Sequence, residues 1–193
     1  MGRPKDYFVT TKLMSYSLYI SLKGPDRIGL VAAVSACLFD LGGNLRDTAF
    51  AVLGTGFEFS CVVEVPDDMD PAAVRSALAA LEPLGGAELT VNEFRDTADQ
   101  GDASPVTHWI EVVGSDQPGL IARVSEVFGE YGANLVRMSS GRERAGRQAA
   151  EGPRYVTRFE VSIPPERAGA CLAAVDNTAG QLALTCNWGS VRR

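Results

Sequence analysis

The repeat that decides the fold of this chain reads GPDRIGLVAAVSACLFDLGGNL at residues 24–45 and GSDQPGLIARVSEVFGEYGANL at residues 114–135. Ten of the 22 aligned positions are identical, at a constant offset of 90 residues. Self-similarity at a fixed spacing marks a repeated structural unit. The sequence therefore predicts two copies of one small module within its 193 residues.

Working outward from the repeat, hydrophobic periodicity gives both copies the same order of elements. Alternating apolar residues predict strands, apolar residues at helical spacing predict helices, and glycine or proline separates them. We expect Asp26 to cap the first helix, Gly42 to end it, and Pro118 to open the matching helix of the second copy. The elements expected in the first copy are a strand over 18–22, a helix over 30–41, strands over 45–53 and 57–65, a helix over 71–81 and a strand over 87–94. Those expected in the second are a strand over 107–113, a helix over 118–131, strands over 134–140 and 155–163, a helix over 165–179 and a strand over 182–188.

This element order defines the fold class. A βαββαβ unit forms a ferredoxin-like α+β domain, in which an antiparallel four-stranded sheet carries two helices on one face. The sequence predicts two such domains, over residues 17–95 and 107–190, joined by a polar linker over 96–106. Because edge strands invite pairing, we expect a homodimer or a side-by-side arrangement of the two domains.

The two copies differ in one connection. The offset between them is 90 residues up to Leu135 but 98 at the third strand, where Val65 matches Ile163. About eight extra residues therefore lie within GRERAGRQAAEGP, residues 141–153. This segment has little to bury, so we expect a long, charged and mobile hairpin connection.

Composition narrows the classes of function. A net charge of −6 argues against direct contact with nucleic acid or with anionic membranes. No apolar run approaches the roughly 20 residues of a membrane span, and the first 14 residues lack the apolar core of a signal peptide. Four scattered cysteines without a CxxC pair suit a reducing compartment. We therefore expect a cytoplasmic protein.

The sequence contains few residues that could form a catalytic or metal-binding motif. The single histidine, His108, lies in a strand pattern and is interpreted as structural. The carboxylates of Asp67, Asp68 and Asp70 precede a helix, where capping explains them. We predict no enzyme activity, no metal and no cofactor.

The strongest site signal is the repeated loop between the first strand and the first helix. Its glycines allow a close approach of the backbone to a ligand, and free N–H groups at a helix start favour a carboxylate. Asp26 and Asp116 could accept a hydrogen bond from a ligand ammonium, and an amide at Asn44 or Asn134 could hold a zwitterion. Capping and turn formation explain the same residues without a ligand. The candidate ligand-binding residues are Gly24, Asp26, Arg27, Gly29, Leu30, Asn44, Gly114, Asp116, Gln117, Gly119, Leu120 and Asn134.

These residues resemble a known family. The pattern D-x-x-G-L/I, a helix of about twelve residues and then G-x-N-L/I is similar to the ACT domain, an amino-acid-sensing module, over about 17–95 and again over 107–190. The first copy departs from it at Ile28, where the family often has proline. The resemblance implies a ligand between two modules, held by the loop of one and the asparagine of another. If only one loop binds ligand well, we expect it to be the one at Asp116.

Two such modules alone resemble the glycine cleavage system transcriptional repressor family. That resemblance implies a non-enzymatic regulator that binds a small amino acid such as glycine and acts through a DNA-binding transcription regulator. The alternatives are a protein-interaction subunit that regulates a metabolic enzyme without its own ligand, a small hydrolase on a ferredoxin-like scaffold, and an RNA-binding sheet. The sequence lacks the phosphate-binding loop that the hydrolase would need. It also lacks the basic face and exposed aromatic residues that an RNA-binding sheet would need.

Overall fold

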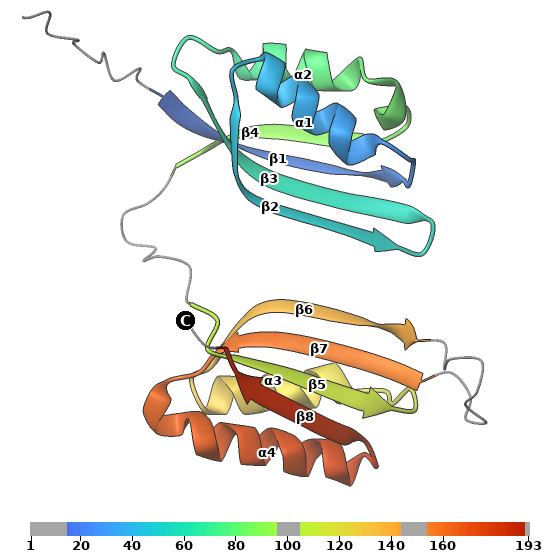
Figure 1. Cartoon of the computed structure of the whole chain (residues 1–193), viewed down its shortest axis with the longest axis vertical. Coiled ribbons are helices and arrows are strands. Elements are labelled where there is room, and N and C mark those ends of the chain that lie inside the picture. The colour runs from blue at the N-terminus through green and yellow to red at the C-terminus, as the bar shows by residue number, and fades with distance from the viewer. Residues whose placement is uncertain (1–14, 96–104, 144–153, 192–193) are drawn as a thin grey trace, which may run out of the picture. The chain divides into compact units, whose positions relative to one another are not determined.

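The computed structural model describes residues 15–95, 105–143 and 154–191. They fall into two compact units that divide between positions 97 and 98. We call the described residues 15–95 module one, and residues 105–143 with 154–191 module two (Figure 1).

Module one is a four-stranded antiparallel sheet with strand order β2-β3-β1-β4. Both of its helices, α1 and α2, cover the same face of this sheet (Figure 1). The elements in chain order are β1 Ser15–Pro25, α1 Leu30–Asp40, β2 Asn44–Leu53, β3 Gly56–Pro66, α2 Pro71–Ala79, a short 3₁₀ helix η1 Glu82–Leu84 and β4 Glu88–Phe94.

Module two repeats this arrangement with strand order β6-β7-β5-β8, again fully antiparallel, and with both helices on one face (Figure 1). The predicted fold class, two ferredoxin-like βαββαβ domains, is confirmed. The elements are β5 His108–Gly114, α3 Leu120–Glu130, β6 Asn134–Glu143, β7 Arg154–Ser162, a 3₁₀ turn η2 Pro165–Arg167, α4 Ala168–Gln181 and β8 Thr185–Ser190.

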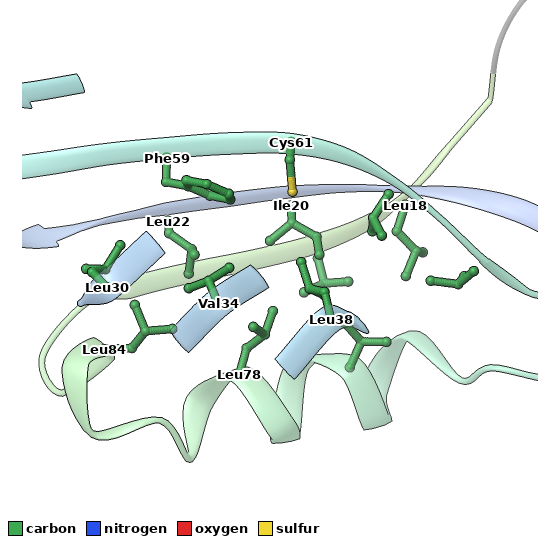
Figure 2. Close-up of a cluster of buried hydrophobic side chains, with 14 of the residues drawn as sticks. Leu18, Ile20, Leu22, Leu30, Val34, Leu38, Phe59, Cys61, Leu78 and Leu84 are labelled. Atoms are coloured by element: carbon green, nitrogen blue, oxygen red, sulfur yellow. The ribbon is translucent and has the colours of Figure 1, made fainter. Parts of the chain in front are cut away.

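The core of module one follows the predicted periodicities. Alternate residues of β1 and every third or fourth residue of α1 are at most 1% exposed and lie between the sheet and the helices (Figure 2). Burying a side chain of this size contributes roughly 1.5–3 kcal/mol, so the apolar faces of the two elements hold each other in place. The residues concerned are Leu18, Ile20, Leu22, Leu30, Val34 and Leu38.

The core of module two is built in the same way, with one polar exception. Phe128 of α3 and Phe159 of β7 pack edge to face, with ring centroids 5.6 Å apart. Among the described residues, the buried polar side chain is that of Thr157, which is 1% exposed in the middle of β7.

The ends of the first helix of each module follow one backbone pattern. Gly42 and Gly132 have positive φ angles of 77° and 66°, which glycine adopts without strain. The following N–H groups, of Gly43 and Ala133, donate back to the carbonyls of Leu38 and Phe128 at 2.8 Å. These bonds satisfy helical carbonyls that would otherwise be left open, and they confirm the predicted end of the helix at Gly42.

The predicted boundaries of β6, α4 and β8 were wrong. Strand β6 continues through Gly141–Glu143, which pair with β7, so the strand ends later than expected. Residues 144–153, for which a mobile connection was predicted, lie outside the described residues. Helix α4 begins at Ala168 after a 3₁₀ turn. It also runs on to Gln181, so the last strand begins at Thr185 instead of Leu182. The cause is a tight turn at Ala183, where φ is 57°.

In the part of the chain that the structure describes, no helix is both long enough and apolar enough to span a membrane.

Candidate functional site

The loop from β5 to α3 exposes the start of a helix. Gly119 precedes the first helical residue with a φ of 85°, and no side chain caps the helix. In such a helix the N–H groups of the first turn lack intrahelical acceptors. Here they include those of Ile121 and Ala122, so the loop presents an electropositive backbone surface.

A cavity of about 210 Å³ lies beneath this loop. It brings together all five loop residues that the sequence predicted for module two, Gly114, Asp116, Gln117, Gly119 and Leu120. The rest of its lining consists of Val112, Ser115, Ile121, Ala122, Ser140, Tyr155, Thr157 and Leu184.

The cavity has one buried polar position. The hydroxyl of Thr157 lies 2.8 Å from the hydroxyl of Ser140 on the neighbouring strand β6. A hydroxyl has one donor and two acceptor sites, so the pair retains hydrogen-bonding capacity beyond the bond that joins it.

Beside the cavity, charge of both signs is present. The carboxylate of Asp116 lies 3.8 Å from the guanidinium of Arg142, and both side chains are largely exposed. The amide of Gln117 donates to the hydroxyl of Ser115 at 3.0 Å. An exposed ion pair of this length contributes little to stability, so its parts are available to a charged ligand.

The prediction that Asp26 caps the first helix was wrong. The helix begins after Gly29, whose φ is 84°, and no side chain caps it. Asp26 instead donates its backbone N–H to the carbonyl of Thr55 at 3.0 Å, which ties the loop to the turn between β2 and β3. The predicted start of the matching helix at Pro118 was also wrong, since α3 begins two residues later, at Leu120.

Module one has the same loop backbone but different surroundings. The guanidinium of Arg27 donates to the carbonyl of Glu82 at 3.0 Å, so this candidate side chain contacts η1. A wider and more open hollow of about 330 Å³ lies nearby and includes Gly24. The other loop candidates, Asp26, Arg27, Gly29 and Leu30, do not line it.

Phenylalanines in module one match three residues that line the cavity from β6 and β7. We call these residues, Ser140, Tyr155 and Thr157, the floor of the cavity. Strand registers pair Ser140 with Thr157 in module two and Phe50 with Phe59 in module one. Phe59 is 1% exposed and lies among the side chains between the sheet and the helices (Figure 2). Next to it, the rings of Phe50 and Phe57 stack with centroids 6.4 Å apart.

The two candidate asparagines lie far from the loops of their own modules. Gly24 pairs with Phe57 but Asn44 with Glu64, seven residues further along β3. In module two the partners of Gly114 and Asn134 are likewise seven residues apart along β7. At about 3.4 Å per residue, each loop and asparagine are about 24 Å apart, so no single module brings them together.

In the described residues, the carboxylates before α2 and the buried cysteine of module one have structural explanations. No cluster of three or more metal-binding side chains occurs in residues 15–95, 105–143 and 154–191. Asp70 caps α2, accepting from the N–H of Ala72 at 2.9 Å, as predicted. Burial raises the pKa of the Cys61 thiol to about 11, so it stays protonated and unreactive at neutral pH.

The sequence prediction missed the floor of the cavity, residues Ser140, Tyr155 and Thr157. A signal for them was present. Aligning the copies at offsets of 90 and 98 sets these three hydroxyl-bearing residues against Phe50, Phe57 and Phe59. Two phenylalanines are exchanged for serine and threonine and the third for tyrosine, which indicates that one copy keeps a space that the other fills.

The fold and its repeated loop place the chain in a known class. The ACT domain family matches residues 17–87 in module one and residues 108–168 in module two. The chain belongs to this family as a tandem ACT-domain protein.

Among known proteins it is similar to the glycine cleavage system transcriptional repressors of Escherichia coli (strain K12) and Shigella flexneri. Each is 28% identical over 138 residues, which cover 69% of this chain and 68% of the relative.

Solved structures agree on the fold. A protein of unknown function from Galdieria sulphuraria has a TM-score of 0.74 at 21% identity, over 93% of this chain and all of its own. A putative glycine cleavage system transcriptional repressor has a TM-score of 0.58 at 13% identity, over 93% of this chain and 99% of its own.

Proposed function

We propose that this chain is a cytoplasmic, non-enzymatic regulatory protein that senses a small amino acid in the cavity of module two. The observation that carries the proposal is the cavity beneath the loop at Asp116, which combines an uncapped helix start with an exposed carboxylate. The N–H groups of the helix start suit the ligand carboxylate, and Asp116 suits its ammonium group.

The regulated process is proposed from the relatives. They are named as repressors of the glycine cleavage system, and we propose that this chain likewise controls transcription of glycine or one-carbon metabolism. The net charge of −6 disfavours direct contact with DNA. Action through a DNA-binding transcription regulator is therefore the mechanism that we propose.

Calorimetric titration of the full chain with a panel of amino acids tests the sensing role. We expect binding that Asp116→Asn weakens by about 10- to 100-fold, because a charge-assisted hydrogen bond is lost. Asp26→Asn, at the matching position of module one, is the control and leaves the affinity unchanged. The absence of binding by the wild-type chain would contradict the proposal, as would equal effects of the two variants.

A second experiment tests the route to transcription. The purified chain is mixed with labelled promoter DNA of a glycine cleavage operon, and fluorescence anisotropy is measured at low and at physiological salt. We expect no sequence-specific complex until the DNA-binding regulator of that operon is added. A specific complex with the chain alone would show direct DNA recognition and overturn this part of the proposal.

A protein-interaction subunit without its own ligand is the second candidate. It is favoured by apolar side chains exposed at the loop end of module one, where Ile28 is fully exposed and Leu53 is 61% exposed. Exposed apolar groups of this kind mark protein contacts. If partner binding required these residues and no amino acid bound to the chain, this function would replace the first.

A further inference from the structure

The floor of the module-two cavity is polar where the fold does not require it. Thr157 is 1% exposed, faces the cavity and bonds to Ser140 at 2.8 Å. The matching positions of module one are Phe59 and Phe50, within the same strand order and register. The fold therefore accepts a filled core at this place.

Leaving the space open has a cost. Removing buried apolar bulk destabilises a core by the lost transfer free energy and by the cavity that remains. In module two the aromatic bulk lies further along the sheet instead, in the pair Phe128 and Phe159. An open cavity with a hydroxyl pair at its floor is thus a feature that stability alone does not explain.

The volume and lining of the cavity restrict its occupant. An engineered cavity of about 150 Å³ already accommodates benzene, and this one measures about 210 Å³. An amino acid whose charged groups lie beside Asp116 would therefore extend a side chain toward the floor. Glycine has no side chain to fill that space.

The lining of the cavity is of two kinds. Val112, Leu120 and Leu184 contribute buried apolar side chains, whereas the floor carries the Ser140 and Thr157 hydroxyls. The bond between the two hydroxyls uses one O–H donor. A ligand hydroxyl can accept from the remaining O–H, whereas an apolar side chain would cover that O–H without pairing it. The floor therefore distinguishes a hydroxyl-bearing side chain from an apolar one of the same shape.

We propose that the Ser140–Thr157 hydroxyl pair makes this cavity selective for an amino acid with a short hydroxyl-bearing side chain. The proposal rests on the proposed sensing function and adds the chemical class of its ligand. Module one cannot share this selectivity, because Phe50, Phe57 and Phe59 occupy the equivalent positions.

Calorimetric titration of the full chain with threonine, serine, valine, alanine and glycine tests the selectivity. Threonine and valine have the same shape, so their comparison isolates the hydroxyl. We expect the wild-type chain to bind threonine or serine about tenfold more tightly than valine, the ratio expected for one net hydrogen bond. One ligand should bind per chain.

Thr157→Val is the decisive variant. It keeps the shape of the side chain, and the exposed Ser140 left behind can bond to water, so the module should still fold; a thermal melt checks this. In this variant we expect the ratio of the affinities for threonine and valine to fall close to one. Ser140→Ala should reduce that ratio in part. Phe50→Ser, at the position that matches Ser140, is the control and leaves the preference unchanged.

The outcomes separate the two proposals. Equal binding of threonine and valine by the wild-type chain would overturn the selectivity, as would a preference that survives Thr157→Val. Binding of glycine or alanine that depends on Asp116 would then still support amino-acid sensing. If no amino acid bound to the wild-type chain, both proposals would fall.

Discussion

Glycines at matched positions, near the ends of β1 and β5, permit close contacts with the residues just before β4 and β8. A Cβ atom on Gly24 would lie 2.9 Å from the backbone Cα of Ala87, whereas one on Gly114 would lie 2.4 Å from the end of the Leu184 side chain. A backbone atom next to a paired strand can shift little, but a leucine tip can rotate. The two glycines therefore differ in how strictly they are required.

We expect Gly24→Ala to destabilise module one by about 1–3 kcal/mol, because overpacking forces the backbone apart. Gly114→Ala should cost less, since Leu184 can shift. Gly129→Ala in α3, with no neighbour within 4 Å, should stabilise module two by roughly 0.5–1 kcal/mol. Denaturant unfolding measures all three, and a Gly24→Ala variant as stable as the wild type would contradict the close contact.

The buried cysteine of module one provides a second test at the scale of the residue. Burial raises the pKa of Cys61 to about 11. Above the pKa of about 9 of an exposed thiol, the unfolded chain loses a proton that the folded chain retains. Stability from this group is therefore complete below pH 9 and is lost as the pH rises toward 11.

We expect the free energy of unfolding of the wild type to fall between pH 8.5 and 10.5, relative to its value at pH 7. In Cys61→Ala the same fall should be smaller, because the thiol is absent. Denaturant unfolding at several pH values measures this difference. Parallel curves for the two proteins would show that Cys61 has an ordinary pKa.

At the scale of the element, helix α2 starts differently from α1 and α3. The side chain of Asp70 caps α2, with Pro71 as its first residue. The helices α1 and α3 instead begin after glycines with positive φ and have no side-chain cap. Of the two uncapped helices, α3 opens onto the candidate site.

We expect Asp70→Ala to destabilise module one by about 1 kcal/mol, because the N–H of Ala72 loses its acceptor. Asp68→Ala, two residues earlier and exposed, is the matched control and should change stability by less than about 0.5 kcal/mol. Thermal unfolding distinguishes them, and equal effects would show that general acidity near the helix matters more than the cap.

Periodicity predicted the elements well because strand and helix patterns are local. It failed where two structures compete for the same residues. Asp26 has the residue type of a helix cap, yet the loop at Gly29 satisfies the backbone without it. The last strand of module two was placed early because Leu182 and Leu184 suit a strand as well as the end of a helix.

The candidate site was predicted in part, for a similar reason. The loop residues could be found because glycine, aspartate and their spacing are visible along the chain. The separation of Asn134 from the loop at Asp116 depends on strand register, which no local pattern reports. The polar floor at Thr157 becomes visible only when the two copies are compared with each other.

At the scale of the whole molecule, the outer strands of the two modules differ in chemistry. Phe50, Val52 and Leu53 of β2 are 44%, 47% and 61% exposed. The positions that match Val52 and Leu53 in β6 are Arg142 and Glu143, which are charged. An apolar edge strand favours pairing with another chain, whereas a charged one opposes it.

We expect the chain to form a homodimer through the β2 edges of two copies. Val52→Arg, which introduces the residue of the matching position in β6, should shift light scattering toward the monomer. Arg142→Lys is the control and should leave the mass unchanged. A wild-type monomer, or a dimer unaffected by Val52→Arg, would contradict this arrangement.

In module one, phenylalanines occupy the positions that match the floor of the module-two cavity. This difference affects how the protein would respond to its ligand. With one competent cavity per chain, a single chain saturates along a simple hyperbola. Any Hill coefficient above one must then come from coupling between chains, and its ceiling is the number of chains in the assembly. The steepness of the response would report how many copies act together.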